Sequence, residues 1–259
     1  MSKRVIKKTV ITEEVNDSNK TLIVCVLDRS GSMYSVIDDA IGGFNGFLKK
    51  QKKLDEDATM TVALFDDRYE LLYNNVDLQK VKKMTNDIWT PRGMTRLYDA
   101  IGKTINDVSS ELKKVKKSKR PDKILVAIVT DGHENDSREY NENQIKKLIK
   151  QKEKQDWQFV YLAADQDAFA AGGAIGVTRG NSFSYNNTSA GNAMMFDSLS
   201  NATQLYRSVS TSDANYATVS ASLFDDSGTS DVTVEGDINS TFTTTDGDKT
   251  DAKDEESNS

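Results

Sequence analysis

The chain has 259 residues, of which 37% are hydrophobic, and its formal net charge is −6. This length has room for one sizeable α/β domain and a tail, and the acidic balance disfavours a general nucleic-acid binder. No apolar run approaches the roughly 18 residues of a membrane span, and the basic N-terminus lacks the apolar region of a signal peptide. We therefore expect a cytoplasmic protein with no membrane contact. The single cysteine, Cys25, lies in an apolar run and is predicted to be a small buried hydrophobe.

The first half of the chain is predicted to begin with an N-terminal arm or edge strand over the charged residues 1–20. The continuous β-branched and aliphatic run at 21–28 predicts a strand that is buried on both faces. Apolar residues at helical spacing predict a helix over 33–53. A second strand is predicted at 58–67, and a third at 68–75, which is antiparallel because only an Asp-Asp connection separates the two.

The second half of the chain continues to alternate helices with strands. Helices are predicted at 95–117, 141–155, 167–177 and 191–207, and strands at 123–131, 157–165 and 182–185. This alternation predicts a Rossmann-like α/β domain over 21–207, with a doubly wound, mainly parallel six-stranded sheet, one antiparallel edge strand and helices on both faces. From 208 to 259 the chain is rich in Ser, Thr and Asp without periodicity, which predicts a disordered acidic tail.

Polar side chains follow three predicted elements that are distant in the sequence. Asp28, Ser30 and Ser32 come after the first strand, Thr95 precedes a helix, and Asp131 ends the strand at 123–131. Because the carboxyl ends of parallel strands meet in one crevice, we expect these five side chains to converge. All five offer hard oxygen atoms, which suit Mg²⁺, Mn²⁺ or Ca²⁺ rather than zinc.

This set resembles the metal-ion-dependent adhesion site of the von Willebrand factor A family, written D-x-S-x-S, a distant Thr and a distant Asp. The flanking segments GMTRLYDAI and VTDG are also similar to that family, and the resemblance runs from about residue 20 to about 207. The short form without extra domains is similar to prokaryotic or phage members with a complete site. The resemblance implies that Ser30, Ser32 and Thr95 bind the metal directly, while Asp28 and Asp131 act largely through water.

The same resemblance implies a non-catalytic, divalent-metal-dependent protein-binding module. In that family, the last coordination position of the metal is left to an Asp or Glu of a partner protein. Mg²⁺ suits this arrangement because it prefers octahedral oxygen geometry and keeps several waters. An acidic residue of the tail could fill that position instead, in cis or from a neighbouring chain, because a tether gives an effective concentration in the mM range.

Other interpretations of these residues stay open. Asp28 and its serines could cap a helix, and Asp131 could belong to an Asp-Gly turn. A metal-dependent hydrolase or phosphoryl-transfer enzyme could use the same crevice with His133 as a base. However, Ser30 stands where a D-x-D phosphatase has its second Asp, and the nucleophile-elbow and phosphate-loop patterns are absent from the sequence. A structural scaffold in a larger assembly is a third possibility.

Two further stretches resemble functional motifs but are predicted to have no binding role. The basic run at 113–123 ends a predicted helix, where lysines suit the helix dipole, so it is predicted to be a solvated face. Asp225, Ser227 and Thr229 repeat the spacing of the first motif. They lack a buried strand before them and a helix after them, so we attribute the repeat to tail composition.

Overall fold

Six strands form a single sheet in the order β3-β2-β1-β4-β5-β6. A computed structural model of the protein describes residues 19–224. The strands are β1 (Thr21–Asp28), β2 (Ala58–Phe65), β3 (Tyr69–Asp77), β4 (Lys123–Thr130), β5 (Trp157–Ala164) and β6 (Ser182–Tyr185). Only β3, at one edge, pairs antiparallel with its neighbour, and the other pairs are parallel. The predicted mainly parallel sheet with one antiparallel edge strand is confirmed.

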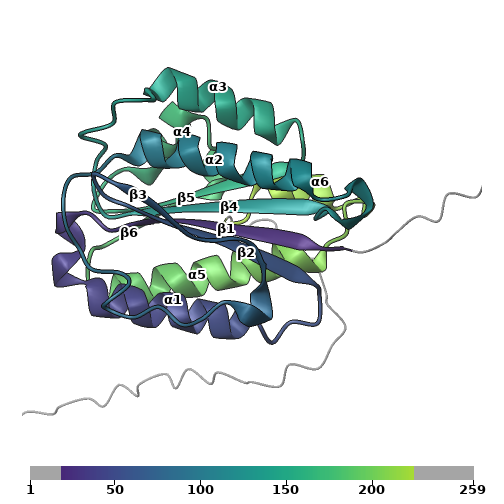
Figure 1. The fold of residues 1–259 in the computed structure, drawn as a ribbon, viewed down its shortest axis with the longest axis horizontal. Coiled ribbons are helices and arrows are strands. Elements are labelled where there is room, and N and C mark those ends of the chain that lie inside the picture. Colours follow the sequence, from purple (N-terminus) through teal and green to yellow (C-terminus); the bar gives the residue numbers. More distant parts are fainter. Residues whose placement is uncertain (1–18, 225–259) are drawn as a thin grey trace, which may run out of the picture.

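Helices cover both faces of the sheet (Figure 1). They are α1 (Ile37–Gln51), α2 (Leu97–Lys114), α3 (Glu142–Glu153), α4 (Ala168–Ile175), α5 (Ser189–Ser208) and α6 (Tyr216–Ala221). In Figure 1, α1 and α5 lie against one face, while α2, α3 and α4 lie against the other. No helix within residues 19–224 is long and apolar enough to cross a bilayer.

Two hydrophobic cores sandwich the central strand β1. Its odd-numbered residues, such as Cys25, pack into the core with α1 and α5, and its even-numbered residues, such as Val24, pack into the core with α2 and α3. Every residue of β1 is buried. This double burial explains why the strand has a continuous apolar sequence instead of an alternating one.

The C-terminal boundary of the domain differs from the sequence expectation of a tail that begins at 208. Val209, Val219 and Leu223 are buried in the core on the α1 side of the sheet. The ring of Phe224 lies 5.4 Å from that of Phe183. Three isolated apolar residues within a Ser/Thr-rich stretch produce no periodic pattern, so this packing could not be predicted from the sequence. The segments 1–18 and 225–259, with the predictions for Asp225, Ser227 and Thr229, lie outside the described residues.

Gly43 in α1 sits where α1 approaches α5 closely. A Cβ atom at this position would overlap the ring of Phe196. We expect Gly43→Ala to lower the free energy of unfolding by about 1–2 kcal/mol, because overpacking outweighs the gain in helix propensity. Gly46→Ala in the same helix is the matched control, since its Cβ would meet nothing within 4 Å. Urea denaturation should show destabilisation for the first variant only, and equal stability of the two would contradict this packing.

Candidate metal centre

The loops after β1 and β4 bring polar side chains together at the carboxyl ends of two adjacent strands. Asp28 is the last residue of β1, and Ser30 and Ser32 lie in the turn that follows it. The Oγ atoms of these serines are 3.0 Å apart, and Ser32 Oγ donates a 2.6 Å hydrogen bond to Asp131 Oδ1. β1 and β4 are also where the sheet order reverses, which is the crevice that favours ligand sites in such folds.

Thr95 joins this group from the loop that precedes α2. A Cβ placed on Gly132 would lie 3.4 Å from both Ser32 Oγ and Thr95 Oγ1, so the two hydroxyls flank the same glycine. Among residues 19–224, no hydrogen-bond partner is found for Thr95 Oγ1, while its backbone N–H donates to Asn135 Oδ1 at 2.9 Å. The structure thus gathers all five sequence-predicted side chains in one place.

Asp28 is buried, and hydrogen bonds hold both of its carboxylate oxygens. Oδ1 accepts from the backbone N–H of Ser30 at 2.7 Å, and Oδ2 accepts from Thr130 Oγ1 at 2.6 Å. Burial raises the pKa of Asp28 to about 6, although these hydrogen bonds act to lower it. These two hydrogen bonds fix the orientation of the Asp28 carboxylate against the loop that follows β1.

Asp131 is a second buried carboxylate of the centre. Burial raises its pKa, against hydrogen bonds from Ser32 and Asn187 that lower it. Neither Asp28 nor Asp131 forms an ion pair with any residue in the described part of the chain. Two neighbouring buried carboxylates without a counter-charge, beside three hydroxyl groups, are chemically suited to a divalent cation.

Several positioning residues escaped the sequence analysis. Thr130 orients Asp28, Asn135 fixes the Thr95 loop, and Asn187 Nδ2 donates to Asp131 Oδ2 at 3.1 Å. Trp89 Nε1 donates to the backbone oxygen of Asp28 at 2.8 Å. Thr130 and Asn135 lie close to Asp131 in sequence and could have been suspected for that reason. Asn187 comes from the loop between β6 and α5, and no sequence pattern points to it.

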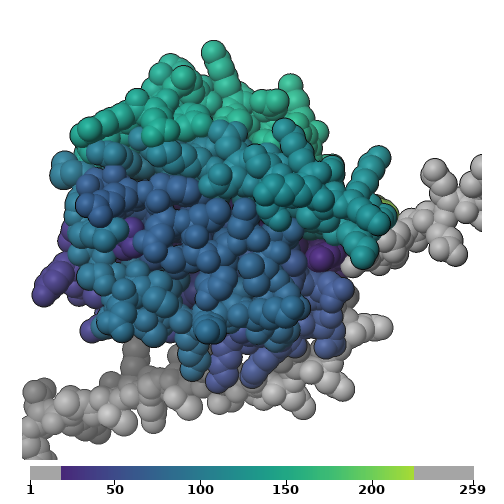
Figure 2. All heavy atoms as spheres, viewed as in Figure 1, coloured from purple at the N-terminus to yellow at the C-terminus, as the bar shows by residue number. Residues whose placement is uncertain are grey.

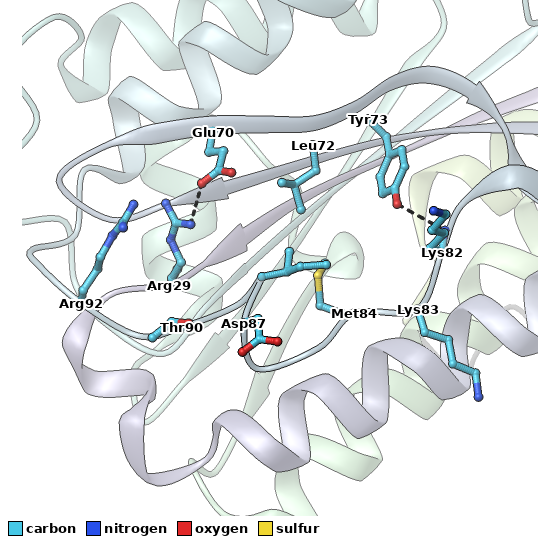
Figure 3. A pocket seen from close by; sticks show the side chains of 11 residues that line it. Arg29, Glu70, Leu72, Tyr73, Lys82, Lys83, Met84, Asp87, Thr90 and Arg92 are labelled. Carbon is cyan, nitrogen blue, oxygen red and sulfur yellow. Dashed lines mark hydrogen bonds and ion pairs between the residues drawn. The ribbon is translucent and has the colours of Figure 1, made fainter.

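Arg29 lies between two site residues but turns away from them. Its Nε donates to Asp66 Oδ2 at 2.9 Å, and its Nη1 pairs with Glu70 at 2.8 Å. Arg92 Nε reaches the same Asp66 oxygen at 2.7 Å, and its backbone N–H donates to the Arg29 carbonyl at 2.9 Å. Figure 3 shows Arg29, Arg92 and Glu70 together at one end of a hollow of about 350 Å³. The buried Asp66 therefore clamps the loop after β1 to the loop before Thr95.

Asp66→Asn is expected to lower the free energy of unfolding by about 3–5 kcal/mol at pH 7, because it leaves the buried Arg29 without its main counter-charge. Burial acts to raise the pKa of Asp66, but bonds from Arg92 and Arg68 and the charge of Arg29 lower it overall. At pH values above the usual Asp pKa, the Asp66 carboxylate therefore contributes its full stabilisation. This stabilisation is lost as the pH falls through the lowered pKa of Asp66.

Urea denaturation at pH 7 and at pH 3 tests this clamp, with Asp87→Asn as the control. Asp87 is exposed and lines the same hollow. The difference in the free energy of unfolding between wild type and Asp66→Asn should be smaller at pH 3 than at pH 7. No difference at pH 7, or a larger difference at pH 3, would contradict the role given to Asp66.

His133 and Cys25, whose residue types often bind metals or take part in catalysis, do not belong to this centre. His133 is exposed, and no hydrogen bond joins it to a described residue. Within residues 19–224, no group of three or more His, Cys, Asp or Glu side chains is placed to hold a metal. Cys25 is fully buried within β1, as predicted. The donors at the centre are therefore oxygen atoms of hydroxyl and carboxylate groups.

The fold and the oxygen-rich centre at its switch point define a doubly wound α/β domain with a candidate cation site. A sequence model of the von Willebrand factor type A domain matches residues 23–204. The chain therefore belongs to the von Willebrand factor type A domain family. Domains of this family are often metal-dependent protein-interaction modules and are generally not enzymes. No curated protein matches the sequence.

Solved structures share the fold at low sequence identity. The vWF domain of the type V pili tip protein Mfa5 from Porphyromonas gingivalis is 11% identical, with a TM-score of 0.54 over 71% of this chain and 95% of that chain. A von Willebrand factor type A protein from Catenulispora acidiphila is 12% identical, with a TM-score of 0.50 over 70% and 42%. Proximal thread matrix protein 1 from the mussel byssus is 14% identical, with a TM-score of 0.50 over 70% and 45%. The chain spans less than half the length of the last two proteins.

Proposed function

We propose that this domain binds a protein partner through a divalent cation and performs no catalysis. The observation that carries the proposal is the convergence of three hydroxyl groups with two carboxylates that lack a counter-charge. Ser30, Ser32 and Thr95 would hold the cation, and Asp28 and Asp131 would balance its charge and act largely through water. A cation bound there supplies an electrophilic position that an Asp or Glu of a partner can fill.

The donor set supports a hard cation. Carboxylate, hydroxyl and water oxygens suit Mg²⁺, with Mn²⁺ or Ca²⁺ as substitutes. Within the described residues, Asp28 and Asp131 are the carboxylates of the five-residue set, so a divalent cation is not over-neutralised and keeps its attraction for an outside carboxylate. Ser32 is exposed, which leaves the site open to a partner.

Two exposed apolar side chains border the centre and indicate the character of the partner. Tyr34 is 79% exposed in the turn that contains Ser32, and Met94 is 50% exposed next to Thr95. The turns that carry them are joined by a 3.2 Å hydrogen bond from Gly31 N to Gly93 O. An acidic residue flanked by apolar side chains would place its carboxylate at the cation and bury these two anchors.

Two measurements test the proposal. Calorimetry with Mn²⁺ and Mg²⁺ on the full chain should show binding that Ser32→Ala and Thr95→Ala abolish, whereas Ser35→Ala, in the same turn, should leave it intact. Peptides selected from a library with a fixed central Glu should then bind only with metal present and should lose binding on Glu→Gln replacement. Unchanged metal binding in Thr95→Ala, or peptide binding that survives chelation, would refute the proposal.

A further inference from the structure

A second hollow, with basic walls, lies at the other end of the sheet from the candidate metal centre. Lys113, Arg120 and Lys152 line it together with Trp157, and its volume is about 290 Å³. We call these four residues the basic hollow. Trp157 is the first residue of β5, whereas the metal centre lies beyond the last residues of β1 and β4. Strands of this length separate the two sites by about 25 Å.

Among residues 19–224, the cations of the basic hollow have no acidic partner. No Asp or Glu lines the hollow, and none of Lys113, Arg120 and Lys152 forms an ion pair with a described residue. Lys152 Nζ lies 4.8 Å from the centre of the Trp157 ring. Burial lowers the pKa of Lys152, and the charge of Lys113 lowers it further. Like charges thus face one another across the hollow, so an anion placed there would be stabilised.

The neighbouring surface extends this positive charge. The segment 113–120, between α2 and β4, contributes four more lysines, and it projects at one end of the molecule (Figure 2). Among these four, only Lys114 forms an ion pair within the described part of the chain, with Glu111 at 3.0 Å. The hollow therefore lies in a broad basic face of an otherwise acidic chain.

The described chain ends at the same end of the sheet as the basic hollow. Leu223 N donates to Asn181 Oδ1 at 2.9 Å, and Phe224 N donates to the Gly180 carbonyl at 2.9 Å, just before β6 begins. Ala221 lines a small neighbouring hollow together with Trp157, the residue that also lines the basic hollow. The segment that follows residue 224 therefore starts beside β6, one hollow away from the cations, and Glu153 and Asp156 also line that neighbouring hollow.

That following segment has a net negative charge larger than that of the whole protein. Residues 225–259 contain eleven Asp or Glu residues and two Lys residues, which gives a net charge of −9. The other 224 residues consequently carry +3 of the total of −6. The negative charge of segment 225–259 is thus complementary to the positive charge of the basic hollow.

We propose that the acidic segment 225–259 docks in cis on the basic hollow. Its 35 residues can extend at most about 120 Å, so every cation of the basic face lies within reach. Covalent attachment gives its carboxylates an effective concentration in the mM range, which allows several weak ion pairs to act together. The carboxylates that dock there would lie at the end of the sheet opposite the candidate metal centre.

Carbodiimide cross-linking of the full chain tests this docking, because the reagent joins carboxylates to lysine amines only when the two are in contact. In low salt, mass spectrometry should find cross-links from 225–259 to Lys113, Lys152 and the lysines at 114–119. These should disappear in about 1 M NaCl, where the Debye length is about 3 Å. In a mixture of isotope-labelled and unlabelled protein, the cross-links should join segments of the same isotope.

Charge-removing variants supply the matched comparison. In a Lys113→Gln/Arg120→Gln/Lys152→Gln chain, cross-links to the remaining lysines at 114–119 should fall about tenfold, equivalent to about 1.4 kcal/mol. Lys49→Gln/Lys82→Gln/Lys83→Gln removes the same charge elsewhere and should change nothing. Cross-links spread evenly over Lys49, Lys82 and Lys83, cross-links of mixed isotope, or cross-links unaffected by the first variant would overturn the proposal. Binding of a DNA oligonucleotide to the hollow in the full chain would also overturn it.

Discussion

Asp28→Asn is expected to abolish stabilisation of the domain by Mg²⁺ and, at the same time, to stabilise the metal-free protein by about 1–3 kcal/mol at pH 7. Burial raises the pKa of Asp28 to about 6 in the folded chain, above its usual value of 3.8. The folded state therefore holds the proton more tightly than the unfolded state does. The contribution of Asp28 to the stability of the metal-free wild type should consequently be greatest at acidic pH and be lost as the pH rises through about 4 to 6, and the variant should lack this loss.

The amide can keep the local geometry of Asp28. Thr130 Oγ1 lies 2.6 Å from Asp28 Oδ2 and 2.9 Å from the Gly132 carbonyl, so it can donate to the carbonyl and accept from the new amide. Urea denaturation between pH 4 and 8, with and without Mg²⁺, tests the prediction, and Asp55→Asn at an exposed site is the control. A Mg²⁺ concentration of 100 times the Kd should add about 2.7 kcal/mol to wild type. An equal Mg²⁺ effect in the variant would contradict the role of Asp28.

Lys123→Met is expected to lower the free energy of unfolding by about 3–5 kcal/mol. Lys123 is fully buried at the start of β4. Its Nζ donates to the carbonyls of Tyr206, Arg207 and Val209 at 2.8, 2.8 and 2.5 Å, at the end of α5. Burial lowers the pKa of Lys123 to about 8, which still leaves three donors at pH 7. Methionine fills a similar volume but removes this donor from the three carbonyls, of which that of Arg207 keeps a 2.9 Å hydrogen bond from Asn19 Nδ2.

Thermal and urea unfolding of Lys123→Met should be compared with Lys119→Met, which removes the same charge from an exposed position a few residues away. The control should change stability by less than about 0.5 kcal/mol. If both variants behave alike, the three hydrogen bonds to the end of α5 contribute little. Loss confined to Lys123→Met would show that this buried amine anchors α5.

The strand pattern and the candidate site were largely visible in the sequence for physical reasons. β1 and β4 are buried on both faces, so their sequences are continuous apolar runs that turns interrupt sharply. Asp28 and Asp131 follow these runs directly, and parallel strands bring their carboxyl ends together. Helix ends were less accurate. The expected helix over 33–53 begins at Ile37, because the preceding turn is a 3₁₀ helix whose Gly31 bonds to the Gly93 carbonyl.

Features that depend on contacts between distant residues could not be predicted. Asn187 meets Asp131 across 56 positions, and Arg29 meets Asp66 across 37. Neither pairing leaves a local pattern, because an Asn in a polar loop and an Arg in a turn are ordinary in sequence. The last described residues were misjudged for the same reason, since Leu223 is buried by partners such as Asn181 that lie about 40 positions away.

The Asp66 clamp has a consequence for the speed and strength of cation capture. Since one carboxylate holds Arg29 and Arg92, the loops that carry the hydroxyl ligands lose their freedom when the domain folds, not when the ion arrives. Preorganised ligands bind more tightly because no ordering entropy remains to oppose binding. If the proposed cation binding holds, a centre assembled in this way would act as a rigid receptor, and Asp66 would set its affinity without touching the ion or the partner.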